Sequence, residues 1–192
     1  MKMNVTTLVA PSAEPLGLAE AKDYLRIAFD GEDDLVAGLI SGARSRIEET
    51  ARVALITRTL RVTLDRWPAR TVETRVLRLP VRPADGLISV KVLDAEGVAE
   101  TVTGRFTLSP GRSSRLIWTS GAFPWPRARA NAIEVEYTAG FGEMAEDVPE
   151  ALSLALKRLV AHAYHSRDAA TLNGDLPEDV AGLISPWRRV TL

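Results

Sequence analysis

The sequence predicts an α+β protein: a small helical bundle with an inserted antiparallel β-rich region and a C-terminal docking tail. Apolar residues recur at helical spacing near both ends of the chain, whereas they alternate with polar residues over about 55–140. A length of 192 residues with 46% apolar content suits one domain with an inserted lobe. We expect this single domain, 1–192, to be helical over about 16–53 and 147–168, and to end in a tail over about 176–192.

Two helices are expected near the amino end. The first is short and ends near Ile27. The second begins around Asp33 and Asp34, because carboxylates are favourable at the amino end of a helix. Its apolar stripe has four-residue spacing: Leu35, Leu39, Ala43, Ile47 and Ala51. Neither helix can bury an apolar face alone, so we expect both to pack against a later helix.

The central region carries the alternation of half-buried strands. The expected strands cover 60–64, 88–92, 106–108, 115–119 and 132–138. The segment from Asp94 to Gly97 predicts a hairpin turn, with glycine where a positive φ is needed. These features favour an antiparallel sheet inserted between the second and third helices.

A strand passes directly into the third helix within 133–167. Gly140 and Gly142 give the backbone freedom for a sharp exit from the sheet. Asp147 stands three residues before Glu150, a spacing that indicates a capped helix start. The expected buried face consists of Leu152, Ala155, Leu156, Leu159, Val160 and Ala163.

Composition excludes several classes of protein. The chain has no cysteine, which removes disulfides, thiol nucleophiles and zinc-thiolate sites and favours folding in the cytoplasm. No apolar run approaches the roughly 20 residues that span a bilayer, and the amino end lacks a signal-peptide pattern, so we expect no membrane partner. A net charge of -1 does not favour tight binding to nucleic acid.

Charge is unevenly distributed along the chain. Residues 14–34 hold seven acidic residues against two basic ones, whereas residues 101–129 hold five arginines and no acidic residue. Such asymmetry is typical of surfaces that meet other charged surfaces.

The sequence offers no credible active site. His162 and His165 lie three positions apart on the third helix but lack the neighbouring acids that a metal or catalytic site requires. The segment 140–142 lacks the lysine of a phosphate-binding loop, and no serine stands in a Gly-x-Ser-x-Gly motif. We expect no enzyme activity, no cofactor and no metal.

Two alternative functions stay open. The first two helices could belong to a DNA-binding regulatory protein, with Arg44, Arg46 and Arg52 near phosphates. Against this, Asp33 and Asp34 would face the phosphates at the end that enters the groove. The second alternative, a small hydrolase, requires a convergent polar pocket.

The four tryptophans form two pairs. Trp67 and Trp118 stand at strand positions and are expected in the core or on a sheet face. Trp125, between two prolines, and Trp187, in the tail, have little local core to enter. For Trp187 we expect a contact with another molecule rather than with its own domain.

An ordered series of motifs extends over nearly the whole chain. In order they are LAEAKDYLRI (18–27), DGEDD (30–34), IEE (47–49), LITRTL (55–60), LP (79–80) with Pro83, ISVKVLD (88–94), YTAGFG (137–142), VPE (148–150) and LVAHAY (159–164) with Arg167. This series resembles the small head-tail connector (adaptor) proteins of long-tailed DNA phages and phage-derived gene transfer agents. The resemblance is weakest over 66–76 and 101–129.

The resemblance implies a structural role. Members of this family form a ring, commonly of twelve copies, that binds the portal protein and offers a platform to the next connector (stopper) protein and the tail. Double-stranded DNA passes through the ring without sequence-specific binding, which suits a near-neutral channel wall. The protein would assemble in the host cytoplasm and reside in the virion or gene transfer agent particle, at the head-tail joint.

Two sets of residues are candidate contact sites. The portal-docking set follows a short helix expected near 178–184: Leu183, Ile184, Trp187, Arg188, Arg189 and Leu192. Family members place this carboxy-terminal segment against the portal, and because Pro186 ends the helix we expect the tail to become fully ordered only there. The ring-interface set pairs basic with acidic loops: Arg127 and Arg129 with Glu143 and Asp147.

Overall fold

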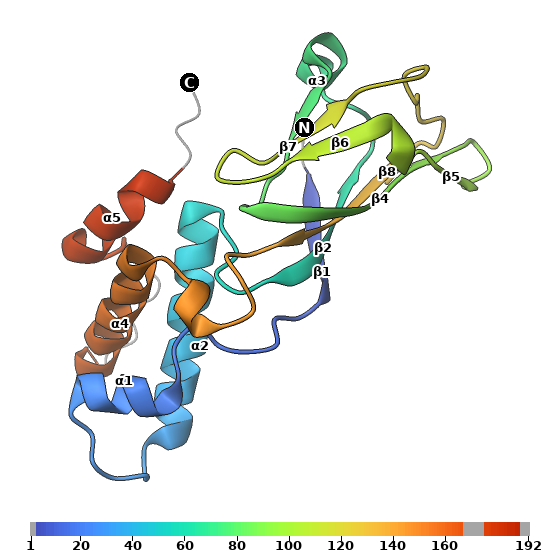
Figure 1. The fold of residues 1–192 in the computed structure, drawn as a ribbon. Coiled ribbons are helices and arrows are strands. Elements are labelled where there is room, and N and C mark those ends of the chain that lie inside the picture. Colours follow the sequence, from blue (N-terminus) through green and yellow to red (C-terminus); the bar gives the residue numbers. More distant parts are fainter. Residues whose placement is uncertain (1–2, 167–174, 189–192) are drawn as a thin grey trace. The chain divides into compact units, whose positions relative to one another are not determined.

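The computed structural model describes residues 3–166 and 175–188 and has two compact units. The β-rich unit comprises Met1–Ala10 and Thr57–Gly140, and the helical unit comprises Pro11–Ile56 and Phe141–Leu192. The fold is α+β, as predicted, and Figure 1 traces it along the chain. The chain therefore passes between the two units three times.

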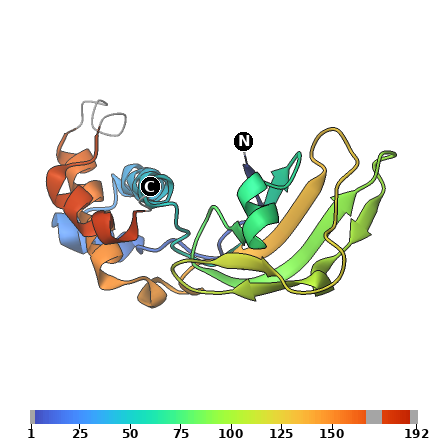
Figure 2. The ribbon, with the colours of Figure 1, turned by 90° about the horizontal axis from the view of Figure 1, so that it is seen from above.

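The helical unit is built around the antiparallel pair of its two long helices. Its described elements are α1 (Leu18–Leu25), α2 (Asp33–Ala51), η2 (Ala145–Asp147), α4 (Glu150–His165), α5 (Glu178–Ile184) and η3 (Ser185–Trp187). The Tyr164 hydroxyl near the end of α4 donates to the Glu32 carboxylate just before α2, which fixes the antiparallel sense of these two helices. Figure 2 shows α5 beside α4, and the two helices are in contact.

One apolar core holds these helices together. The side chains that α4 contributes include Leu152, Ala155, Leu156, Leu159 and Val160, which confirms the predicted face of this helix. From α2 come Val36, Ile40, Ala43, Ile47 and Ala51.

The expected stripe on α2 is wrong at its amino end, where Leu35 is 45% exposed and Val36 is fully buried. A step of four residues advances about 40° past a full turn, so repeated four-residue steps drift around the helix. By this geometry Leu35 lies roughly 160° from Ala51, whereas Val36 lies only about 60° away. The mixed three- and four-residue spacing is therefore the one that stays on the buried face.

The start of α4 also differs from the prediction. Pro149 occupies the N-cap position of α4, and no side chain caps the helix there. Asp147 instead closes the preceding turn, because its Oδ2 accepts the Met144 N–H at 3.0 Å. A Cβ at Gly142 would lie 2.1 Å from the same carboxylate oxygen, so this turn requires glycine.

The β-rich unit contains two antiparallel sheets. The first has the order β1 (Asn4–Val9), β2 (Arg58–Leu64), β8 (Ile133–Ala139), β4 (Ala84–Leu93) and β5 (Ala99–Thr101). The second has the order β3 (Val76–Arg78), β7 (Arg115–Trp118) and β6 (Phe106–Ser109). The remaining elements are the short helix α3 (Ala69–Thr74) and the turn η1 (Thr103–Arg105).

The central strand β8 shows why the alternating sequence forms this sheet. Ile133, Val135 and Tyr137 are fully buried, and each pairs across the ladder with an apolar residue of β2. The buried Tyr137 hydroxyl is satisfied by Val81, whose carbonyl accepts at 3.2 Å and whose N–H donates at 3.3 Å. Burial raises the pKa of this phenol, so it stays neutral.

The predicted hairpin turn between β4 and β5 is confirmed. Gly97 has a φ of 83°, and the Asp94 carboxylate accepts the N–H groups of Glu96 and Val98 at 3.0 and 2.8 Å. This Asx-type turn reverses the chain without help from the core.

Candidate interaction surfaces

The two units carry opposite charge. By sequence, the β-rich unit holds fourteen basic and eight acidic residues, a formal charge of +6. The helical unit holds ten basic and seventeen acidic residues, a formal charge of -7. The net charge of the chain, -1, hides this division. Copies of the protein can therefore attract one another through unlike units.

The Trp125 loop, residues 123–129 between β7 and β8, presents an exposed aromatic side chain. Trp125 is 62% exposed, although its ring contacts that of Phe123 at a centroid distance of 4.9 Å. Beneath it, the buried Trp67 donates from Nε1 to the Pro124 carbonyl at 2.6 Å. Trp125 thus lacks a core to enter, as predicted, and its loop is held in place from below.

The two arginines of the same loop, Arg127 and Arg129, are exposed. The backbone N–H groups of Arg127 and Ala128 donate to the Leu93 carbonyl at 3.0 and 3.2 Å, which anchors the loop to β4. Within residues 3–166 and 175–188, neither guanidinium takes part in an ion pair. Both charges are therefore free to meet a partner.

Of the two acidic residues in the predicted ring-interface set, only Glu143 is uncommitted. Its side chain is exposed and makes no ion pair in the described part of the chain. Asp147 is exposed too, but its carboxylate forms the turn before α4. Sequence spacing alone does not distinguish an acid that shapes a turn from one that faces solvent.

A hollow of about 430 Å³ lies between η2, the amino-terminal half of α4 and the start of the helical unit. Its apolar lining includes Pro15, Val148 and Leu154, and Glu146 and Glu150 add carboxylates. We call it the η2–α4 hollow. Sequence analysis did not find it, because the segment around Pro15 is more than a hundred residues away from η2 in the chain.

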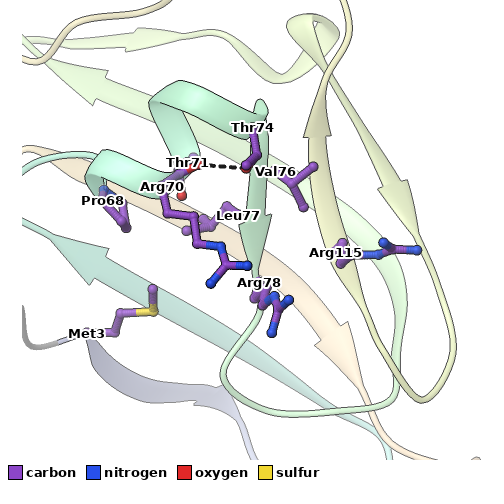
Figure 3. Close-up of a pocket in the computed structure, with 9 residues that line it drawn as sticks. All are labelled: Met3, Pro68, Arg70, Thr71, Thr74, Val76, Leu77, Arg78 and Arg115. Carbon is purple, nitrogen blue, oxygen red and sulfur yellow. Dashed lines mark hydrogen bonds between the residues drawn. The ribbon is translucent and has the colours of Figure 1, made fainter. Parts of the chain in front are cut away.

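A second pocket, of about 310 Å³, lies in the β-rich unit and is basic. Figure 3 shows its three arginines on three elements: Arg70 on α3, Arg78 on β3 and Arg115 on β7. None of the three makes an ion pair within the described ranges, so they add to the positive surface of this unit.

The portal-docking set is divided by the structure. Ile184 is fully buried in the core of the helical unit, and Leu183 packs against that core. Trp187 packs edge-on against Phe141, with ring centroids 5.2 Å apart. Arg188 is exposed, whereas Arg189 and Leu192 lie outside the described residues.

Trp187 therefore packs on its own domain, against the expectation, and a contact with another molecule stays a prediction. Pro186 follows the end of α5 and stands in the turn η3, where the Arg188 N–H bonds back to the Ile184 and Ser185 carbonyls. This turn directs the indole onto Phe141, which lies between Gly140 and Gly142 where the chain leaves β8. An aromatic residue between two glycines was the feature of the sequence that could have indicated this contact.

The histidines take structural positions. His162 Nε2 lies 3.1 Å from Asp179 Oδ1 and so joins α4 to α5. Desolvation opposes ionisation of Asp179, but its bonds to His162 keep the pKa of that carboxyl below its usual range. Across residues 3–166 and 175–188, no three His, Cys, Asp or Glu side chains form a group that could hold a metal ion.

The amino end of α2 keeps its acidic character. Lys22 pairs with Asp30 and Asp33 at 2.7 and 2.6 Å, and this pairing lowers the pKa of Asp30. Asp34 is exposed. In the part of the chain that the structure describes, no helix has the length and apolar character of a membrane span.

Comparison with known proteins gives a consistent result. No protein-family model and no curated protein matches the chain. Among solved structures, it is similar to a chain of the "Virion of native gene transfer agent (GTA) particle", with a TM-score of 0.82 and 27% identity over 98% of this chain and 96% of that one.

Two further structures resemble the chain over its full length. In the "Neck of empty GTA particle computed with C6 symmetry", the similar chain has a TM-score of 0.82 and 28% identity, covering 98% of this chain and 97% of that one. In the "Neck of native GTA particle computed with C12 symmetry", the values are 0.76 and 28%, covering 100% and 97%.

Proposed function

We propose that this protein is a structural connector of the head-tail joint in a gene transfer agent or tailed phage particle. Copies of it form a ring, of twelve subunits, that binds the portal and continues the DNA channel toward the next connector (stopper) protein and the tail. Its role is structural rather than enzymatic, and DNA passes without sequence-specific binding.

One observation carries this proposal: the likeness to chains of gene transfer agent particle and neck structures extends over both units. A shared fold alone does not imply a shared function. Here, however, the alignment covers 98% of this chain and 96% of the other at 27% identity, so the likeness includes both units and supports a connector role for the whole chain. The C12 symmetry of one neck structure supports twelve copies.

The candidate contact residues divide between two kinds of interface. We assign Arg127 and Arg129 in the β-rich unit, and Glu143 in the helical unit, to contacts between neighbouring copies. A ring closes when two different surfaces of the same chain complement each other, and unlike charge provides this. We assign the carboxy-terminal segment to the portal through the exposed Arg188 and the half-buried Leu183 and Trp187, and we extend this assignment to Arg189 and Leu192, which lie outside the described residues.

Particles made without this protein test the proposal. Producing cells that lack it are expected to accumulate DNA-filled heads without tails, and a copy of the gene supplied separately is expected to restore tailed particles. Electron microscopy of the released particles distinguishes the outcomes. Normal tailed particles in its absence would contradict the proposal.

A further inference from the structure

We propose that the Trp125 loop of one copy docks into the η2–α4 hollow of a neighbouring copy. This inference rests on the proposed ring and specifies the two surfaces that close it. One surface belongs to the positive unit and the other to the negative unit, so every copy supplies both.

The loop is built as a rigid anchor. Trp125 stands between Pro124 and Pro126, which restrict the backbone, and the Pro124 carbonyl is held by Trp67 at 2.6 Å. Because the loop backbone is already held, Trp125, whose side chain is 62% exposed, loses little backbone freedom on binding. Tryptophans that become buried when two proteins bind dominate the affinity of many protein interfaces.

The hollow has the size and lining that such an anchor needs. Its volume of about 430 Å³ lies within the roughly 300–1,000 Å³ of pockets that enclose small ligands, which is large enough for an indole ring. Leu154 in its wall is 36% exposed, and Met144, next in sequence to the lining residue Ala145, is 59% exposed. Apolar side chains that remain open to solvent in one copy would be covered by the tryptophan of the next.

The charges around the two surfaces are complementary. Arg127 and Arg129 follow the tryptophan, while Glu146 and Glu150 line the hollow, and none of the four makes an ion pair in the described residues. The one lysine of the hollow, Lys157, is already paired with Glu20 at 2.6 Å. The carboxylates are therefore available for arginines of a second copy.

Cross-linking provides a direct test, because the chain has no cysteine of its own. The variant Ala128→Cys with Ser153→Cys places one thiol in the Trp125 loop and one in the hollow wall without removing the tryptophan, its two flanking prolines or the charges. Oxidation of assembled full-length protein is expected to give a ladder of covalent oligomers. Each single-cysteine variant gives at most dimers, and Val98→Cys with Ser153→Cys controls for random collision.

Binding measurements give the second arm. Trp125→Ala is expected to weaken association of copies about 30-fold, the loss typical of an anchor worth 2 kcal/mol, whereas Val98→Ala, equally exposed in the same unit, has no effect. Arg127→Glu with Arg129→Glu is expected to weaken it as well. Adding Glu146→Arg and Glu150→Arg to this variant is expected to restore association. If Arg127 and Arg129 only supported the fold of their own loop, reversing the charges of the hollow would not compensate for their loss.

The outcomes separate this inference from the proposed function. If Trp125→Ala forms normal portal-bound rings and the double-cysteine variant gives no ladder, the docking is overturned and the connector role stays intact. If Trp125→Ala forms normal rings that no longer bind the stopper, the loop contacts that partner instead, and the docking is again overturned. Absence of any association between wild-type copies, with or without portal, would overturn both.

Discussion

At the scale of single residues, the buried hydroxyl of Tyr137 in the β-rich unit has specific partners, since it both donates to and accepts from the backbone of Val81. A buried hydrogen bond adds little net free energy to the stability of the fold. Removing one partner lowers the stability by more, because the other partner stays buried without a hydrogen bond.

Tyr137→Phe is accordingly expected to lower the free energy of unfolding by about 1–2 kcal/mol, because the Val81 N–H and carbonyl lose their partner. Chemical denaturation measures this. Tyr24→Phe, at a side chain 44% exposed, serves as the control and is expected to change little. Equal stability of the Tyr137 variant and the wild type would show that water replaces the hydroxyl.

A second residue-scale prediction concerns acid stability. The bond from Arg61 holds the pKa of Glu136 below its usual range, so the pair stabilises the fold above the ordinary glutamate pKa of about 4.3. That contribution is lost as the pH falls through the lower, folded-state value. Between pH 7 and pH 3, Glu136→Gln should therefore lose less stability than the wild type, by about 1 kcal/mol.

Thermal unfolding across this pH range checks the prediction. Glu96→Gln, in the exposed hairpin turn, provides the matched control. A Glu136 variant whose pH dependence matches that of the wild type would mean that the Arg61 pair adds nothing to stability.

At the scale of elements, the sequence predicted those that have a clear period. The residues of α4 and α5 and the alternation in β2, β4 and β8 lie where expected, because each pattern covers several turns or pairs. The strand β1 was not predicted. Its six residues are all exposed, so no buried face imposes an alternation on the sequence.

Long-range contacts account for the other differences. The helix α3 has only six residues and no apolar stripe, and its existence depends on the surrounding sheets. Trp187 was expected to contact another molecule rather than its own domain, because its partner, Phe141, lies far away in the chain. Of the candidate surfaces, the sequence identified Trp125 and the arginines, which are local features, but not the hollow that the fold assembles.

The carboxy-terminal segment has two expected roles, packing against Phe141 and binding the portal, and two variants separate them. Trp187→Ala is expected to cost about 2 kcal/mol of stability, because the indole leaves Phe141. Deleting residues 189–192 keeps the Arg188 N–H that closes η3 and is expected to change stability by less than about 0.5 kcal/mol while abolishing portal binding. Calorimetry and a pull-down with portal measure the two effects. A deletion variant that still binds portal would remove these residues from the docking surface.

At the scale of the whole molecule, the dominant feature is the division of charge between two units of opposite sign. A protein with a net charge of -1 is only weakly repelled by its own copies, yet unlike units attract when they meet. For the proposed ring, each copy therefore supplies both of the unlike surfaces that a head-to-tail contact needs, while its net charge stays close to zero.

Ring formation should consequently weaken as salt is added. The Debye length falls from about 10 Å at 0.1 M to about 3 Å at 1 M, which screens contacts between exposed charges. Analytical ultracentrifugation over this range measures the shift toward monomer. Arg66→Glu with Arg70→Glu changes the net charge as much as reversal of Arg127 and Arg129, so it controls for charge alone. Association that strengthens steadily with salt would instead assign the interface to apolar contacts.

Electron microscopy of the purified protein mixed with its portal tests the connector role most directly. The expected result is a ring of twelve copies seated on the portal, coaxial with its channel, that disappears when residues 189–192 are deleted. If the two proteins stay separate at concentrations where each is intact, or if this protein binds the portal as scattered single copies without a ring, the connector role is contradicted.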